Sequence, residues 1–139
     1  MRKSLSILVG VFVVTLAFFV QAAVAQEDVG RLIKQLEDDS DRFSNTTTKA
    51  LDASKWDGTD AEDEMIKYVR NFEDAIDRLK KSYEGGRDTM PDAKEVQVRA
   101  KTIDKFLKKN SLGPQVDTEW GTVRSDLLRL AKTEKVKTT

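Results

Sequence analysis

The chain has 139 residues, with 24 basic and 24 acidic side chains and neither histidine nor cysteine. The missing residue types exclude zinc and blue-copper sites, haem ligation by histidine, di-iron bundles of the Glu-x-x-His kind and any nucleophile–histidine pair. Disulfides and a lipid anchor on cysteine are excluded as well, so an exported domain of this composition is stabilised by packing alone.

The N-terminus has the pattern of a secretory signal peptide. Two basic residues precede an apolar run over residues 5–20, and Ala23 and Ala25 place small side chains at the −3 and −1 positions before Gln26. This order of basic, apolar and small residues is typical of a segment that signal peptidase removes. We therefore expect residues 1–25 to be cleaved and the protein to be exported, either periplasmic or secreted.

An uncleaved membrane anchor is the alternative reading of the same segment. Residues 5–25 span 21 positions, and about 20 helical residues can cross a bilayer. The strongly apolar stretch ends at Val20, however, which favours cleavage.

The part that follows the signal peptide is predicted to be one domain. It has 114 residues with 22 basic and 24 acidic side chains, a net charge of −2. A nucleic-acid-binding protein is expected to carry a basic excess, so nucleic acid is not an expected partner. We predict a four-helix domain over residues 26–134 and a disordered tail over residues 135–139.

Residues 28–53 are predicted to form the first helix, because apolar side chains recur every seven residues. The stripe weakens where Ser40 and Thr47 occupy two of its positions, and residues 54–58 end it. The seven-residue series is Val29, Leu36, Phe43 and Ala50.

The second helix has the clearest start in the sequence. Thr59 and Glu62 fit a capping box, in which the hydroxyl and the carboxylate each accept a backbone N–H at the helix start. An apolar seam at alternating spacings of four and three follows, and Gly85 and Gly86 end the helix. The seam consists of Met65, Val69, Phe72, Ile76, Leu79 and Tyr83.

Two further helices are predicted to begin near Pro91 and Pro114, with a break over residues 110–113. Short connections make consecutive helices antiparallel. The predicted fold is thus all-α, an antiparallel up-down-up-down four-helix bundle, as a monomer or homodimer. Two helical hairpins that meet only in a dimer are the alternative. The remaining stripe residues are Ala93, Val96, Ala100, Ile103, Leu107, Val116, Trp120, Val123, Leu127 and Leu130.

Several charged residues lie directly beside stripe residues and are candidates for structural ion pairs. An arginine at the margin of a core can lay its stem on apolar surface and pair with a carboxylate of a neighbouring helix. We expect at least one interhelical Arg–Asp pair in this set. The candidates are Arg42, Arg70, Asp77, Asp104, Arg124 and Asp126.

Aromatic side chains are expected to gather at one end of the bundle, where the first loop meets the end of the third helix. A surface patch there would indicate partner binding, whereas a cap that closes the bundle end explains the same residues without a partner. The cap is the favoured interpretation. The candidate cluster is Trp56, Met65, Phe106 and Trp120.

The carboxylates give no metal-binding or catalytic motif. The acidic runs at residues 37–41 and 57–64 do not match a calcium loop and are interpreted as solvated helix faces. Glu73 and Asp77 lie one turn apart, the spacing of an acid/base pair, but nothing in the sequence places a pocket beside them. No metal and no cofactor are expected.

Short motifs along the chain resemble a group of small exported bacterial proteins of unknown function. They include Asp41-Arg42-Phe43, Ile103-Asp104-Lys105-Phe106 and a Trp-x-x-x-Arg-x-Asp-Leu element at residues 120–127. The resemblance implies bacterial origin, export, an all-helical fold and no assigned activity. One departure is Gly113, where serine or threonine is expected before the proline.

The sequence thus favours an exported, non-enzymatic helical bundle that acts by binding or as an envelope component. A periplasmic chaperone or stress adaptor is one alternative, and a protein anchored by its uncleaved N-terminal helix is the other. The expected partner is an unidentified protein, with no membrane contact once residues 1–25 are removed.

Overall fold

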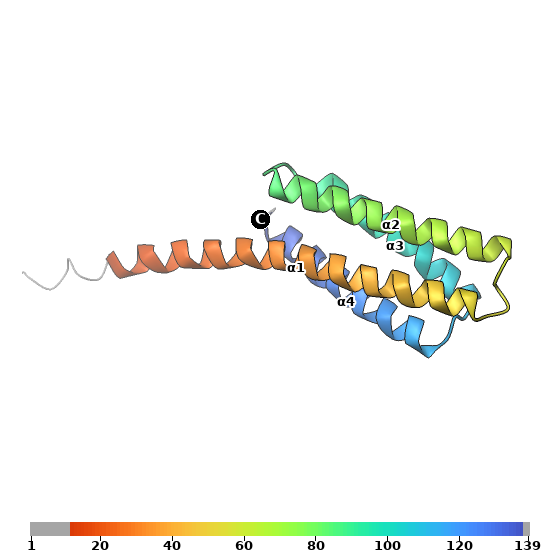
Figure 1. Cartoon of the computed structure of the whole chain (residues 1–139). Coiled ribbons are helices and arrows are strands. Elements are labelled where there is room, and N and C mark those ends of the chain that lie inside the picture. The colour runs from red at the N-terminus through yellow and green to blue at the C-terminus, as the bar shows by residue number, and fades with distance from the viewer. Residues whose placement is uncertain (1–11, 138–139) are drawn as a thin grey trace, which may run out of the picture.

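The computed structural model describes residues 12–137 of the chain and the side chains of residues 29–133. This part is an all-α four-helix bundle with an up-down-up-down course (Figure 1), which confirms the predicted fold class. The helices are α1 (Phe12–Asp52), α2 (Asp60–Glu84), α3 (Met90–Lys109) and α4 (Pro114–Lys137).

Helix α1 is longer than the sequence predicted, because it begins at Phe12 instead of near residue 28. Its first part extends beyond the other three helices in Figure 1. Of the predicted signal peptide, residues 1–11 lie outside the described residues, and residues 12–25 belong to this extension. At the other end, α4 continues through residues 135–137 of the predicted tail, while residues 138–139 are outside the described part.

Helix α2 begins at the predicted capping box. Thr59 is the N-cap, and its Oγ1 accepts the backbone N–H of Glu62 at 3.4 Å. The Glu62 carboxylate reaches back one residue further than expected, to the N–H of Gly58 at 2.6 Å. These bonds satisfy donors that a helix start leaves without an intrahelical partner.

The connection between α3 and α4 depends on Gly113, whose φ is +104°. Side chains with a Cβ rarely adopt this conformation, so a serine or threonine at this position would be strained. The backbone therefore gives a physical reason for the one departure from the resembled pattern.

The core consists of the stripes that the heptad spacing predicted. On α2, Met65, Val69, Phe72, Ile76 and Leu79 are all buried. Facing them, α3 and α4 bury Val96, Ala100, Ile103, Val116, Trp120, Val123, Leu127 and Leu130. Leu107 is only half-buried and packs at the margin, while its neighbour Phe106 points into the core.

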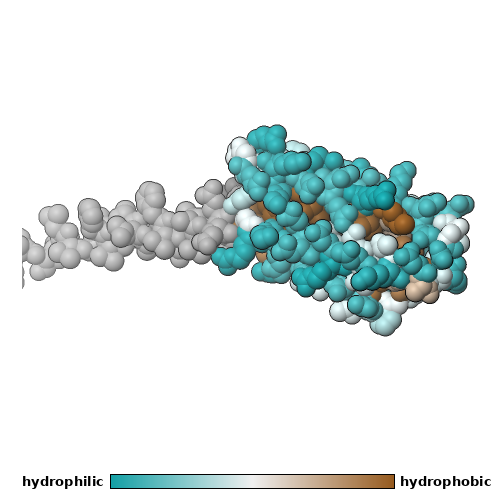
Figure 2. Space-filling view, viewed as in Figure 1, coloured by the Kyte–Doolittle hydropathy of each residue, from teal (hydrophilic) through white to brown (hydrophobic). Residues whose placement is uncertain are grey.

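The four helices do not pack equally. Helix α1 packs most extensively on α4, and α2 on α3; α1 also contacts α2, whereas α3 and α4 approach each other least. Figure 2 shows a largely hydrophilic face, with narrow hydrophobic strips visible between the helices. Within residues 12–137, none of the helices combines the length and the apolar character that a membrane crossing needs.

Candidate functional site between α1 and α4

Two aspartates, Asp39 on α1 and Asp126 on α4, are buried where these helices pack together. Each is only 2% exposed. Asp39 follows Leu36 by three residues and precedes Phe43 by four, so the helical repeat places it on the core side of α1. Burying a carboxylate is costly unless it is paired or protonated, so this pair requires compensation.

An arginine one turn further along each helix supplies part of that compensation. Arg42 forms an ion pair with Asp39, and Arg129 Nη1 lies 3.5 Å from Asp126 Oδ1. The arginine side chains are 65% and 53% exposed, which is the usual arrangement of a stem on apolar surface with the charged head in water. The antiparallel helices thus carry the same Asp-x-x-Arg unit.

The arginines compensate the burial of Asp126 only in part. No donor faces the buried Oδ2 of Asp126 among the described residues, and its neighbour across the interface is the carboxyl group of Asp39. Burial, the hydrogen bond with Asp39 and the charge of Asp39 raise the pKa of Asp126 to about 6, while Arg129 acts in the opposite direction. The Asp126 carboxyl group therefore keeps its proton up to a higher pH than an exposed aspartate does.

Gln35 connects the carboxyl pair to the surface. Its Nε2 donates to Asp126 Oδ1 at 3.1 Å, and its Oε1 accepts from Arg129 Nη1 at 3.4 Å. Gln35 and Arg129 also line a hollow of about 270 Å³ between the helices. The other residues of this basic hollow are Arg31, Leu32, Lys132 and Thr133.

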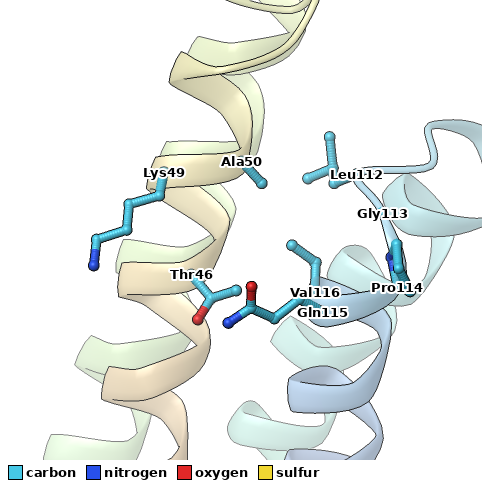
Figure 3. A pocket seen from close by; sticks show the side chains of 8 residues that line it. All are labelled: Thr46, Lys49, Ala50, Leu112, Gly113, Pro114, Gln115 and Val116. Atoms are coloured by element: carbon cyan, nitrogen blue, oxygen red, sulfur yellow. The ribbon is translucent and has the colours of Figure 1, made fainter.

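A second hollow of about 400 Å³ lies at the opposite end of the same two helices (Figure 3). Ala50, Leu112 and Val116 turn toward one another across it, while Thr46 and Gln115 approach each other at one side. Lys49 points away from the space. The lining of this hollow thus mixes apolar side chains with the polar Thr46 and Gln115, and it contains one cationic residue, Lys49.

The fold brings together one interhelical Arg–Asp pair, as expected, among the six charged residues predicted as structural ion pairs. Arg124 and Asp104 come together across α4 and α3, with Nε and Oδ1 3.7 Å apart. Arg42 and Asp126 instead pair within their own helices, with Asp39 and Arg129. Arg70 and Asp77 are both exposed on α2.

The four residues of the predicted aromatic cluster belong to the hydrophobic core or pack against it. Trp120 is buried between Phe43 and Phe72, with ring centroids 4.8 Å and 5.6 Å away, and its Nε1 donates to Asp104 Oδ1 at 2.7 Å. Trp56 is half-buried, with the Lys55 ammonium 4.7 Å from the ring centroid.

The other two members of that cluster, Met65 and Phe106, are buried in the core. The ring of Phe106 meets Tyr68 edge-on at 6.3 Å. These four residues therefore pack within or against the core and do not form one exposed aromatic patch.

Glu73 and Asp77 have different surroundings. Glu73 lies against α1; burial raises its pKa, and a hydrogen bond with Ser44 acts in the opposite direction. Asp77 is exposed, and neither residue lines the hollows described above. The side chains at the predicted cleavage site, Ala23, Ala25 and Gln26, lie outside the described residues.

Sequence reasoning missed three members of this site: Gln35, Asp39 and Arg129. Asp39 lies inside an acidic run that was interpreted as solvated, and Gln35 and Arg129 are unremarkable polar residues of amphipathic helices. The available signal was the polar interruption of the first stripe at Ser40 and Thr47, both of which are buried.

No protein-family model, no curated protein and no solved structure matches this chain.

Proposed function

We propose that this chain is exported and, after removal of residues 1–25, acts as a non-enzymatic binding protein of the cell envelope. Its contact surface is the face formed by α1 and α4. The resemblance to small exported bacterial proteins agrees with this proposal, as does the signal-peptide pattern at the N-terminus.

Cleavage after Ala25 is compatible with the packing of the bundle. Val29 is the first core residue among the described side chains, and it follows Gln26 by three positions. Removing residues 1–25 therefore takes away only the extension of α1 and none of the described core.

The observation that carries the binding function is the polar construction of the α1·α4 face. A bundle gains most stability from apolar contacts, and replacing buried charges by hydrophobic residues often leaves stability unchanged or increases it. Here two carboxyls are buried side by side and connect through Gln35 and Arg129 to a basic hollow at the surface. Such an arrangement is better suited to recognising a ligand than to stabilising the fold.

The same geometry favours binding over catalysis by the aspartates. General acid–base catalysis requires a carboxyl within hydrogen-bond reach of the substrate. The side chains of Asp39 and Asp126 are each 3% exposed, and they face each other, so a substrate does not reach either carboxyl group.

Export is tested by intact-mass analysis of the protein recovered from its native host. We expect a single species in the periplasmic or secreted fraction that begins at Gln26. A full-length chain retained in the membrane fraction would support the anchored alternative and contradict the cleavage.

The contact surface is tested by placing a photoreactive residue at position 132 of α4 and, as a control, at the exposed position 101 of α3. We expect crosslinked species in the native envelope from position 132 and none from position 101. A crosslink to a second copy would identify a homodimer. Equal crosslinking from both positions would contradict the assignment of the α1·α4 face.

A further inference from the structure

The basic hollow between α1 and α4 combines charge with a polar connection to the interior. Arg31 of α1 and Arg129 and Lys132 of α4 supply three cationic side chains. Gln35 adds an amide and Thr133 a hydroxyl, while the buried Leu32 lines the same space.

We propose that this hollow binds a phosphate group, and that Asp126 regulates the binding through its contacts with Gln35 and Arg129. The proposal rests on the proposed function, since it assigns a ligand class and a regulation to the same α1·α4 face. A free phosphate and the headgroup of an anionic lipid share this chemistry.

Phosphate suits the hollow because of the donors that line it. Guanidinium groups present several N–H donors in a planar fork that matches phosphate oxygens, and an ammonium adds a compact charge. Among the residues whose side chains the structure describes, Arg129 is held only by long bonds, 3.4 Å to Gln35 Oε1 and 3.5 Å to Asp126 Oδ1. Strong charge-assisted bonds measure about 2.7–2.9 Å, so Arg129 gains by turning toward a bound anion.

Gln35 and Arg129 couple the hollow to the carboxyl pair, because both line the hollow and both contact Asp126. When Asp126 is protonated, it no longer neutralises Arg129, and the hollow becomes more positive. When Asp126 ionises, its negative charge competes with the ligand for Arg129. Phosphate therefore binds more tightly at pH values where the proton is held.

The charged groups around Asp39 and Asp126 determine whether protonation of Asp126 strengthens or weakens anion binding. On α1, Arg42 is paired with Asp39; on α4, Arg129 faces Asp126. Helix α3 approaches this stretch of α4 with the neutral amide of Gln97, which lies 3.4 Å from the Leu127 carbonyl.

Lys80 of α2 reaches Glu37, which lies between Gln35 and Asp39 in the sequence. Lys80 Nζ donates to Glu37 Oε2 at 2.8 Å. Glu37 does not line the hollow. Asp39 and Arg129 are the charged groups that act most strongly on Asp126.

The test uses the cleaved protein and follows backbone amide NMR shifts during titration with sodium sulfate at pH 5.0 and 7.5. Sulfate is a tetrahedral dianion that does not change its charge over this range, so any pH dependence belongs to the protein. Inorganic phosphate is titrated at pH 7.5, and flotation with phosphatidylcholine vesicles, with and without phosphatidylglycerol, separates a lipid source from a free anion.

We expect sulfate to shift the amides of residues 31–35 and 129–133 and to bind several-fold more tightly at pH 5.0. Arg129→Gln and Lys132→Gln should each weaken binding by about tenfold, the equivalent of one charge-assisted hydrogen bond. The matched controls Arg78→Gln and Lys101→Gln change exposed residues of α2 and α3 and should bind as the unmodified protein does.

Asp126→Asn provides the sharpest test of the coupling, since asparagine imitates the protonated carboxyl at every pH. This variant should bind sulfate tightly at both pH values. Equal binding by Arg129→Gln and Arg78→Gln would overturn the anion site, and a pH dependence that persists in Asp126→Asn would overturn the coupling.

Failure of the anion site can be told apart from failure of the proposed function. If crosslinks from position 132 persist while purified protein binds neither anion nor vesicle, only the phosphate assignment fails. If anions bind but the chain is not exported, the proposed function fails and the anion site remains.

Discussion

Asp38, Asp39 and Asp41 are neighbours in one acidic run, yet only Asp39 is buried. A helix turns about 100° per residue, so a shift of one residue along the helix can move a side chain from solvent into the core. The sequence placed Asp126 among the candidates for ion pairs because Leu127 follows it. Its partner could not be predicted, since the side of α1 that faces α4 is set by how the two helices pack.

The Arg124–Asp104 pair illustrates how solvent exposure limits the free energy that an ion pair contributes to stability. This expected interhelical pair is present, but the Arg124 side chain is 57% exposed and its Nε lies 3.7 Å from Asp104 Oδ1. We now expect a double-mutant cycle with Arg124→Gln and Asp104→Asn to give a coupling of about 0–1 kcal/mol in urea unfolding.

The bond from Trp120 Nε1 to Asp104 Oδ1 should contribute more, because it is short, at 2.7 Å, and part-buried. A cycle that pairs Trp120→Phe with Asp104→Asn is expected to give a coupling of about 1–2 kcal/mol, as for hydrogen bonds to charged groups. A larger coupling for Arg124 and Asp104 than for Trp120 and Asp104 would contradict this expectation.

At the scale of the elements, the sequence predicted all four helices and most of their ends. The heptad spacing on α2 identified five buried residues, and the capping box located the start of that helix. The spacing could not show that α1 begins at Phe12 or that α3 and α4 pack least closely. A short connection makes two helices antiparallel but does not fix how closely they pack.

Phe72→Ala should be the most damaging single truncation on α2. Phe72 is fully buried and its ring contacts Trp120, so the loss is expected to be about 3–5 kcal/mol of unfolding free energy. Leu128→Ala is the control, because Leu128 is 64% exposed, and it should cost less than about 0.5 kcal/mol. Comparable losses in the two variants would show that this seam is not the core.

Gly113→Ser introduces the residue type that the resembled pattern carries before the proline. At a φ of +104°, serine should destabilise the protein by about 1–3 kcal/mol. Gly121→Ser in α4 is the matched control, since nothing lies within 4 Å of an added Cβ there and serine forms helix better than glycine. If Gly113→Ser unfolds at the same urea concentration as the original protein, the strain argument is wrong.

At the scale of the whole molecule, the proton of the Asp126 carboxyl group links the stability of the bundle to pH. The pKa of Asp126 is raised in the folded protein from its usual 3.8 to about 6, so the folded state holds this proton more tightly than the unfolded chain does. Its stabilising contribution is complete below about pH 4 and is lost as pH rises through about 6. The absence of histidine removes the residue type that usually titrates in this range.

The most direct test compares urea unfolding of the cleaved protein and of Asp126→Asn at pH 5.0 and pH 7.5. The comparison cancels contributions shared by both proteins, including that of Glu73, whose pKa is also raised. We expect the original protein to lose about 1 kcal/mol more than Asp126→Asn between the two pH values. An identical pH dependence in the two proteins would contradict a raised pKa of Asp126 at the α1·α4 interface.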